Sequence, residues 1–329
     1  MSTTLKHAPA SMKLTKEVPG AAGVWQSQME KSFPELRVTA LGDTRFSGRF
    51  RSAGREDFQI SDIQASPHLV ERHPGVVSAQ NYHYFKVSLQ LSGTGEMTQG
   101  DRHFKLTPGM LTVYDTSQPY DLRFEEDARF LIAMFPQDAL DIPAGLASEL
   151  SASPLDCTSG VGAMVSEYLC GLSDNLSHFA GPSGERLART GLNLLSTLLV
   201  SKEEELLSES QPHRASLLME MCFFINKHLT NPDLDPELVA AAHFVSTRQM
   251  YNIFKDTGVS VAQWIKQRRL AECKRELADP LLAQSSVATI ARRWSFDEAP
   301  YFSRIFRETY GMTPSQWRQA ALSGVDSPH

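Results

Sequence analysis

The most constraining feature of this sequence is an internal repeat in its last third. Residues 253–257 (IFKDT) precede a glycine and then Gln263 and Trp264, and residues 305–309 (IFRET) precede a glycine and then Gln316 and Trp317. The copies are offset by 52 residues at their start and by 53 at their end. A repeat of this size indicates a duplicated supersecondary unit. The last third is therefore expected to fold as two similar units in tandem.

Each copy is predicted to be a helix-turn-helix unit, at about residues 235–256 and 285–308. In the first unit, helix 236–243 leads through Phe244 and Val245 to helix 247–255. In the second unit, helix 286–293 leads through residues 294–296 to helix 298–307. The spacing of a short helix, a tight turn and a second helix is typical of this motif. Helix-capping patterns support these limits: Asp235 precedes a proline, and capping boxes are predicted at Ser246, with Val245 and Met250 as its hydrophobic staple, and at Thr313.

Residues 260–278 between the two units form one helical run in the sequence. A helix of that length spans about 28 Å. Successive major grooves on one face of B-DNA lie about 34 Å apart. Two recognition helices held about that far apart would let one chain contact two sub-sites in tandem.

The first part of the chain has a different pattern, with short strands from about Leu36 to Pro136. Residues 85–91 alternate apolar and polar side chains, which is the period of a half-buried strand. Turn sequences follow at residues 92–95, 108–109 and 118–119, and they separate further short apolar runs, the last at 130–135. Short strands with regularly spaced turns favour a β-sandwich or a small barrel.

Residues 160–207 are predicted to form an antiparallel helical hairpin. The first helix places apolar side chains at helical spacing on one face, and the second is rich in leucine. Gly181–Gly184 (GPSG) separates the two helices. This hairpin is expected to pack on its own barrel or on a second subunit. The apolar face of the first helix consists of Val161, Met164, Val165, Tyr168 and Leu169.

Charge is unevenly divided along the chain, whose formal net charge is −6. Residues 214–320 hold 14 basic and 11 acidic side chains, a balance of +3, whereas residues 1–213 balance to −8. A basic C-terminal part behind an acidic N-terminal part is compatible with a division of labour in which the C-terminal part binds nucleic acid. The hydrophobic fraction of 41% argues against wholesale disorder.

The four cysteines lie far apart and form no Cys-x-x-Cys, so a disulfide framework or a zinc module is not expected. With no signal-like start and no apolar run long enough for a membrane helix, a cytoplasmic location without membrane association is predicted. The expected organisation is a disordered tail (1–20), an N-terminal domain (21–207), a linker (208–214), a C-terminal domain (215–320) and a second tail (321–329).

The C-terminal part resembles the AraC/XylS family of transcription regulators. The resemblance spans about residues 214–320 and rests on many spaced positions, among them Arg269, Ile290 with Ala291, Phe302, Phe306, and the Gly-x-Thr-Pro that begins at Gly311. Two positions depart from the family pattern. Ser295 stands where the family usually has glycine, which puts the geometry of the second turn in doubt. Cys273 stands where a small residue is usual, and cysteine packs there as a small hydrophobe.

The resemblance and the helical pattern together predict the residues that contact DNA. By resemblance, base contacts fall on Arg248, Tyr251 and Asn252 in the first unit and on Ala299, Pro300, Ser303 and Arg304 in the second. Arginine pairs with guanine and asparagine with adenine in the major groove. Gln249 and Arg307 point outward as well, and Thr247 and Lys255 are placed for phosphates. The second unit is expected to contact fewer bases, because Ala299 and Pro300 offer no side-chain donor.

The resemblance also implies a function for the N-terminal part: a cupin-like barrel that senses a small effector and pairs subunits. The predicted fold is thus an α+β two-domain chain, with a β-rich cupin-like barrel and helical hairpin followed by an all-α double helix-turn-helix domain. Its partners would be double-stranded promoter DNA, RNA polymerase, a small-molecule effector and a second copy of the chain, with transcriptional activation as the expected output. Candidate walls of an effector pocket are the aromatic residues Phe85, Phe104, Tyr114 and Tyr120, for which a plain core role is the alternative.

No catalytic set, metal site or cofactor is predicted. The histidines of the strand region (His68, His73, His83 and His103) are scattered, and no His-x-His, phosphate loop or nucleophile elbow occurs. Two alternatives stay open at this point. One is a cupin-like enzyme fused to a DNA-binding domain, and the other is an architectural DNA-binding protein that needs no ligand.

Overall fold

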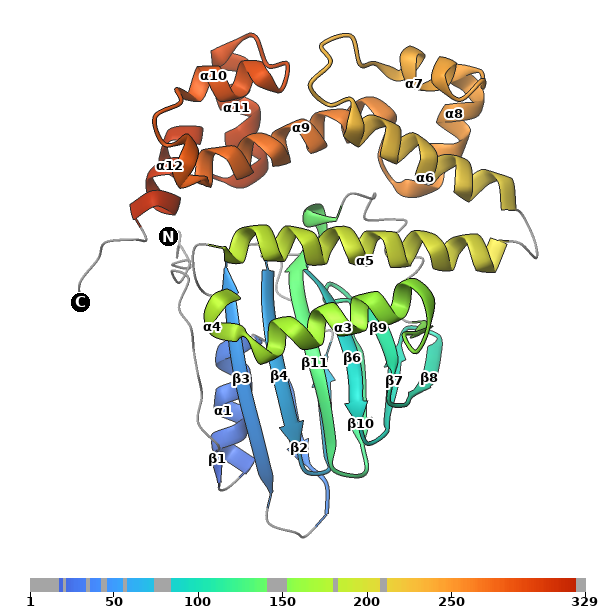
Figure 1. The fold of residues 1–329 in the computed structure, drawn as a ribbon, viewed down its shortest axis with the longest axis vertical. Helices are drawn as coiled ribbons and strands as arrows, with labels where there is room; N and C mark the ends of the chain where they lie inside the picture. The colour runs from blue at the N-terminus through green and yellow to red at the C-terminus, as the bar shows by residue number, and fades with distance from the viewer. Residues whose placement is uncertain are drawn as a thin grey trace. The chain divides into compact units, whose positions relative to one another are not determined.

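The computed structural model describes residues 18–19, 22–33, 36–42, 46–55, 58–73, 84–140, 153–179, 183–207 and 212–323. The chain separates into two compact units. The first comprises Met1–Leu140 with Ala147–Lys202, and the second comprises Asp141–Leu146 with Glu203–His329. In their described parts, the first unit is a β-sandwich with covering helices and the second is helical (Figure 1).

Two antiparallel sheets form the sandwich, as the sequence predicts for this part of the chain (Figure 1). The seven-stranded sheet has the order β1 (Val18–Pro19), β3 (Ser47–Arg55), β4 (Phe58–Ala65), β11 (Ala128–Pro136), β6 (Tyr84–Ser92), β9 (Met110–Asp115) and β12 (Pro154–Asp156). The five-stranded sheet has the order β2 (Arg37–Ala40), β5 (His68–Arg72), β10 (Tyr120–Phe124), β7 (Gly95–Gln99) and β8 (Arg102–Leu106).

Helices cover the outer face of the seven-stranded sheet. They are α3 (Gly160–Asp174), α4 (Leu176–Phe179) and α5 (Gly184–Leu207), and the short η1 (Gln137–Ala139) follows β11. The predicted hairpin is present, because α3 and α5 lie side by side and the Tyr168 hydroxyl of α3 donates a hydrogen bond of 2.6 Å to the Leu187 carbonyl of α5 (Figure 1). Residues 180–182 of the predicted separator lie outside the described residues. Packing on the barrel accounts for only part of the predicted apolar face, because the side chain of Met164 is 62% exposed.

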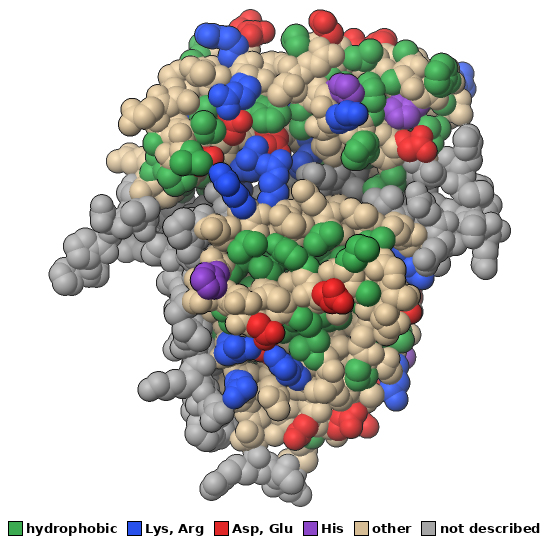
Figure 2. Space-filling model, in the orientation of Figure 1, with side chains coloured by type: hydrophobic (Ala, Val, Ile, Leu, Met, Phe, Trp, Pro, Cys, Tyr) green, Lys and Arg blue, Asp and Glu red, His purple; other side chains and the backbone are tan. Residues whose placement is uncertain are grey.

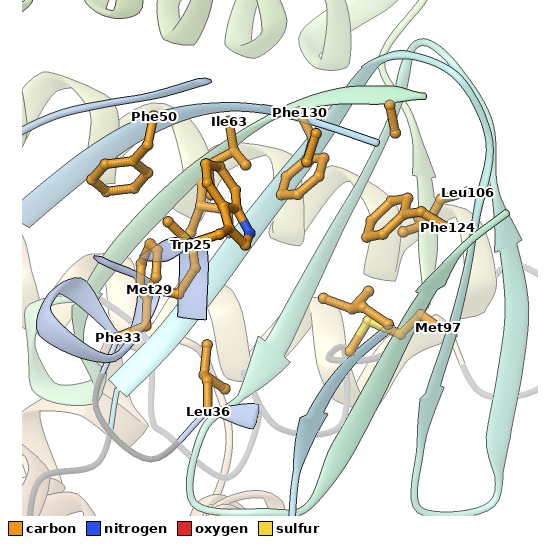
Figure 3. Packing of buried hydrophobic residues seen from close by; sticks show 14 of the residues in the cluster. Trp25, Met29, Phe33, Leu36, Phe50, Ile63, Met97, Leu106, Phe124 and Phe130 are labelled. Atoms are coloured by element: carbon orange, nitrogen blue, oxygen red, sulfur yellow. The ribbon is translucent and has the colours of Figure 1, made fainter. Parts of the chain in front are cut away.

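The core of the sandwich lies between the two sheets, and α1 (Ala22–Ser32) contributes to it. Trp25 and Met29 of α1 are four residues apart and therefore lie on one face of the helix, and Phe33 continues the same row. Figure 3 shows these three side chains reaching toward Phe50 and Phe130 of the seven-stranded sheet. Because α1 inserts its apolar face between the sheets, part of the sandwich interior is filled from the chain's N-terminal region.

The second unit consists of short helices arranged around one long helix. They are α6 (Pro212–Lys227), α7 (Pro236–Ala242), α8 (Thr247–Phe254) with η2 (Lys255–Thr257), α9 (Val261–Ala278), η3 (Pro280–Leu282), α10 (Val287–Arg293), α11 (Ala299–Tyr310) and α12 (Pro314–Ser323). The long helix α9 runs from the pair α7–α8 to the pair α10–α11 (Figure 1). It corresponds to the predicted helical run and spans about 27 Å at 1.5 Å per residue.

Three predicted segments fall largely on residues that the structure does not describe. The tail 1–20 lies outside the described residues except for Val18–Pro19, which form β1. Residues 208–211 of the predicted linker also lie outside them, and α6 begins at Pro212, three positions before the predicted start of the C-terminal domain. In the tail 321–329, α12 continues to Ser323 and the following residues are not described.

Candidate DNA-binding helices and effector pocket

The helices α7 and α8 form the first helix-turn-helix unit, and N-cap side chains fix where both begin. The Asp235 carboxylate accepts a hydrogen bond of 2.8 Å from the Leu238 amide, and the Ser246 hydroxyl accepts one of 3.2 Å from the Gln249 amide. These bonds satisfy amide groups that have no partner inside the helix. The N-caps predicted at both residues are confirmed. The full capping box at Ser246 is not formed, because the exposed Gln249 side chain makes no return bond.

The second helix of this unit, α8, separates a buried face from an exposed one. Met250, Ile253 and Phe254 are almost completely buried, as predicted. Each residue predicted to contact DNA from this unit lies on the exposed side: Thr247, Arg248, Gln249, Tyr251, Asn252 and Lys255. The Tyr251 ring is 46% exposed, which is unusual for a large side chain with an apolar body.

The second unit, α10 and α11, repeats this arrangement with a different outer face. Ser286 caps α10 through a 3.0 Å bond from the Thr289 amide, and Phe302 and Phe306 are buried in the core of this half. Among the predicted contacts, Ala299, Pro300, Arg304 and Arg307 are exposed and Ser303 is half-buried. Sequence reasoning missed Tyr301, whose ring is 39% exposed and lies 5.7 Å from the Arg304 guanidinium. Their spacing of three residues on a helix is what brings the two together.

Both turns contain a residue in the left-handed backbone region that is not glycine. Phe244 has a φ of 56° and Ser295 a φ of 62°, at corresponding places after α7 and α10. Such a φ is uncommon for any side chain and is a strained conformation for a bulky one. Ser295, which stands where the family usually has glycine, therefore adopts the backbone conformation of the turn, and this conformation is strained for a serine. The matching strain at Phe244, whose ring is 98% exposed, was not predicted.

Polar side-chain bonds connect α9 to the elements on either side of it. On one side, the Arg269 guanidinium donates a 3.0 Å hydrogen bond to the Leu229 carbonyl, after the end of α6. On the other side, Arg293 of α10 pairs with Glu276 of α9 at 2.8 Å, and the Trp317 indole of α12 donates to the Lys274 carbonyl at 3.0 Å. These bonds fix α10, α12 and the segment after α6 to one common helix, and the helices α8 and α11 pack against elements that are held in this way.

The charged side chains of the helical unit are mixed in sign on the face that Figure 2 shows. Blue and red side chains alternate there, which agrees with the balance of only +3 over residues 214–320. Attraction to phosphates alone is therefore weak on that face, and sequence recognition has to come from individual side chains of the exposed helices.

The interior of the sandwich contains a small cavity of about 20 Å³, enough for one water molecule. Two of the predicted wall residues, Tyr114 and Tyr120, line it, and their rings meet edge to face at 4.8 Å. The further lining residues come from α1 and both sheets: Trp25, Met29, Phe33, Leu36, Val38, Ile63, His68, Val70, Lys86, Leu122, Phe130 and Ile132.

The other two predicted wall residues do not line this cavity. Phe85 points to the opposite face of β6, where its ring lies 6.4 Å from that of Phe135. Neighbouring residues of a strand point to opposite faces, so the inward side chain is Lys86. The apolar face of this strand had been expected to be the inner one, but here it is covered by helices. Phe104 is half-buried and packs against the edge of the core.

Lys86 is the one lysine among the cavity-lining residues, and only 3% of its surface is exposed. Its ammonium group donates a hydrogen bond of 2.9 Å to the Tyr120 hydroxyl and lies 4.4 Å from the centre of the Phe33 ring. Burial, with a smaller contribution from the positive charge of Arg72, lowers the pKa of Lys86 to about 7. Burial likewise lowers the pKa of His68, despite its bond to the Ser66 carbonyl, so that this lining residue is neutral at pH 7.

Within the described ranges, no three His, Cys, Asp or Glu side chains come together as a metal site requires. Nor does any described helix combine the length and the apolar composition needed to span a bilayer.

A sandwich that encloses a small cavity, followed in the same chain by two helix-turn-helix units, defines the class of DNA-binding transcription regulators with an effector-binding domain. Residues 25–200 match the family model of the AraC-binding-like domain, and residues 239–320 match that of a helix-turn-helix domain. The first match alone covers more than half of the chain. The chain therefore belongs to the AraC family of transcriptional regulators, and it is not an enzyme.

The chain is also similar to individual proteins of known sequence or structure. The transcriptional activator NphR of a Rhodococcus species is 25% identical over 94% of this chain and 93% of its own length. An uncharacterized protein in the nit 5′ region of Bacillus sp. strain OxB-1 is 31% identical over 66% of this chain and 85% of its own. The solved structure of the AraC-like transcriptional activator CuxR covers 83% of this chain and 94% of its own, at 21% identity and a TM-score of 0.48.

Proposed function

We propose that this protein is an effector-responsive activator of transcription that binds two tandem DNA sub-sites at a promoter of a catabolic or adjacent operon. The observation that carries this proposal is the pair of half-exposed helices α8 and α11, each with a buried apolar face and an exposed polar one. One unit presents Arg248 and Asn252, whose side chains have the groups that pair with guanine and adenine in the major groove. The division of labour follows the predicted domains, with residues 21–207 sensing and residues 215–320 binding DNA.

The two units contribute differently to recognition in this proposal. In the first, Arg248, Tyr251 and Asn252 contact bases, and Thr247 and Lys255 contact phosphates. In the second, the exposed Ala299 and Pro300 lack side-chain donors. Arg304 and Arg307 then act mainly on phosphates, with Ser303 as the remaining polar side chain, so this unit adds affinity more than selectivity.

The names of two relatives support activation and operon control, and an exposed apolar surface supports pairing of subunits. The Rhodococcus relative is named a transcriptional activator, and the Escherichia coli relative that is 30% identical over 41% of this chain is named an arabinose operon regulatory protein. Contact with RNA polymerase follows from activation. Pairing through the α3–α5 hairpin is supported by the exposed Met164, and Figure 2 shows hydrophobic side chains gathered over these two helices. The protein would act in the cytoplasm, where its promoter DNA lies.

The test is a selection of genomic fragments by the purified full-length protein at a fixed salt concentration. The proposal expects a narrow set of promoters carrying two elements about one helical turn apart. Arg248→Ala is expected to cost about 1–3 kcal/mol in binding free energy and to relax selection at one base position. Lys266→Ala, an exposed lysine of α9 outside both recognition helices, serves as the matched control.

Diffuse recovery with a steep salt dependence, unchanged by Arg248→Ala, would refute the proposal in favour of an architectural DNA-binding protein. A reporter gene behind a selected promoter tests the sign of regulation. Activation predicts higher expression in the presence of the protein and its effector, and repression under all conditions contradicts it. Sedimentation of the full-length protein tests pairing, with Met164→Glu expected to shift the equilibrium toward the monomer.

A further inference from the structure

The inner face of the seven-stranded sheet carries polar side chains where a closed core would carry apolar ones. On β6, Lys86, Ser88 and Gln90 point between the sheets, and on β9 the cross-strand partners of the first two are Tyr114 and Thr112. All five side chains are buried. A buried polar group is unfavourable unless it finds a partner, so this row demands an explanation.

The unsatisfied polar groups that line the cavity are hydrogen-bond donors, as far as the described residues show. The Lys86 ammonium has three N–H donors, and its one hydrogen bond in the described structure goes to the Tyr120 hydroxyl. The Trp25 indole N–H, which lines the same cavity, is buried without a partner among the described residues. A ligand that fits this interior therefore has to bring acceptors. Further along the row, beyond the cavity lining, the Ser88 and Thr112 hydroxyls and the Gln90 Oε1 acceptor are also buried without a partner among the described residues, and these groups do not favour a donor or an acceptor.

The charge of the interior points in the same direction. Among the described residues no carboxylate forms an ion pair with Lys86, and the nearest charge that affects it is the positive one of Arg72. Burial lowers the pKa of His68, the other titratable base of the lining, and a neutral imidazole cannot balance the positive charge of Lys86. An anionic ligand would supply the missing counter-ion and, as a carboxylate, up to four acceptor positions.

The position of Phe33 beside Lys86 favours an aromatic body for this ligand. The rings of Phe33 and Phe130 face the cavity together with those of Tyr114 and Tyr120. The free space of about 20 Å³ is too small for an organic ligand, because side chains of α1 occupy the interior. Phe33 in particular holds an aromatic ring 4.4 Å from the Lys86 ammonium, which is the place beside the charge that a ligand ring would take.

We propose that the sandwich interior binds a small aromatic carboxylic acid, with its carboxylate on the Lys86 ammonium and the Tyr120 hydroxyl and its ring in the place of Phe33. Binding then requires the Phe33 side chain, and with it α1, to move aside. The inference rests on the proposed function insofar as this acid is the effector, and it specifies the chemical class of that effector.

The experiment is calorimetric titration of the full-length protein with phenylacetate at pH 6.5, beside three matched probes. Phenylacetamide keeps the ring and removes the charge, 2-phenylethylamine reverses the charge, and octanoate keeps the carboxylate and removes the ring. Phenylacetate is expected to bind, and the amide and the amine to bind about 10- to 100-fold more weakly, the range set by hydrogen bonds to charged groups. Octanoate is expected to bind more weakly than phenylacetate.

Protein variants assign the binding to this site. Lys86→Met is expected to weaken phenylacetate binding at least 10-fold and Tyr120→Phe about 5-fold, because each removes a hydrogen bond to the carboxylate. Lys105→Met, which removes an exposed lysine of β8, is the matched control and leaves binding unchanged. Near-ultraviolet circular dichroism establishes that each variant is folded.

Three results would overturn the proposal: no binding of phenylacetate, equal binding of acid and amide, or wild-type affinity in a folded Lys86→Met variant. Tighter binding of octanoate would overturn the aromatic class. Promoter binding by the same preparation separates this inference from the proposed function. If specific DNA binding is intact and no acid binds, only the ligand class fails. If phenylacetate binds through Lys86 and never alters transcription, the sensing function fails.

Discussion

Replacing Lys86 with methionine should stabilise the protein, although it removes a hydrogen bond. Lys86 is 3% exposed, and burial with the nearby charge of Arg72 lowers its pKa from 10.5 to about 7. The folded state therefore binds the Lys86 proton far more weakly than the unfolded state does. Methionine has a similar length, no charge, and the flexibility to fill an irregular apolar space.

The magnitude follows from that shift in pKa. At about 1.4 kcal/mol per pKa unit, a shift of about 3.5 units makes burial of the charged form unfavourable by roughly 5 kcal/mol below pH 7. The variant loses the bond to Tyr120 and the contact of the ammonium with Phe33, which together offset about 1–3 kcal/mol. The expected gain is about 2–4 kcal/mol in the free energy of unfolding, or roughly 4–16 °C in the Tm of a unit of this size.

The pH dependence identifies the cause of the gain. Between pH 7 and 10.5 the unfolded state binds the Lys86 proton and the folded state does not, so wild-type stability should rise with pH by up to about 1.4 kcal/mol per unit. The other titratable groups that line the cavity with Lys86 do not produce this slope, because burial lowers the pKa of His68, which is therefore neutral throughout this range, and burial raises the pKa of Tyr114 and of Tyr120 above its usual value.

Scanning calorimetry of the full-length protein from pH 6 to 10, with Lys105→Met as the control, measures the effect. The advantage of Lys86→Met should be largest near pH 6, shrink as the pH rises above 7, and vanish between about pH 8.5 and 10. A variant that is less stable than wild type at pH 7, or an advantage that does not change with pH, would refute the reasoning.

Three further predictions concern the strained turns, the second recognition helix and the ligand. Phe244→Gly and Ser295→Gly should each stabilise the protein by about 0.5–1 kcal/mol, because the relief of a left-handed backbone exceeds the entropy that glycine adds to the unfolded chain. Chemical unfolding measures this change, and a loss of stability would mean that the turns are not strained. Arg304→Ala should weaken binding of all DNA sequences about equally and lower the salt slope by about one, whereas a change confined to one base position would make Arg304 a base contact. Phenylacetate affinity should fall about 10-fold per pH unit above pH 7, because the carboxylate requires protonated Lys86. Calorimetry in two buffers should therefore show that the complex takes up a proton at pH 8. An affinity that does not change from pH 6 to 9 would contradict this prediction.

The helical unit was largely predictable from its sequence because its structure is encoded locally. Asp235 and Ser246 cap helices through side chains a few residues away from the amide groups they bind, and such bonds leave a pattern in any short window. The exposed side of α8 followed from the positions of Met250 and Ile253 alone. What the pattern missed is the backbone at Phe244, since a phenylalanine gives no indication of a left-handed turn; only its place one repeat before Ser295 does.

The strands and turns of the sandwich were predictable from the sequence. Which face of each strand points into the sandwich was not. Period-two alternation establishes that Phe85 and Lys86 lie on opposite faces of a strand, and it does not establish which face is inside. In most half-buried strands the apolar face is the inner one. Here helices cover the outer face of the sheet, so both faces are buried, and the choice depends on contacts distant in sequence. The polar residues Lys86, Ser88 and Gln90 were the available sign of an unusual interior.

The same sheet holds two buried charges on opposite faces, and their difference separates a structural charge from one kept for a ligand. Asp62 of β4 is 3% exposed and is paired with two arginines, Arg51 and Arg129, the latter at 3.0 Å. Burial alone would raise its pKa, yet hydrogen bonds from these arginines hold it below the usual value. Asp62 thus has its counter-ions within the fold. Lys86 is equally buried and has no carboxylate partner in the described structure, so it destabilises the fold in which it lies. A side chain that lowers stability on balance and has no counter-ion in its own protein is explained when that counter-ion arrives from solution. The lower stability then provides selectivity for acids.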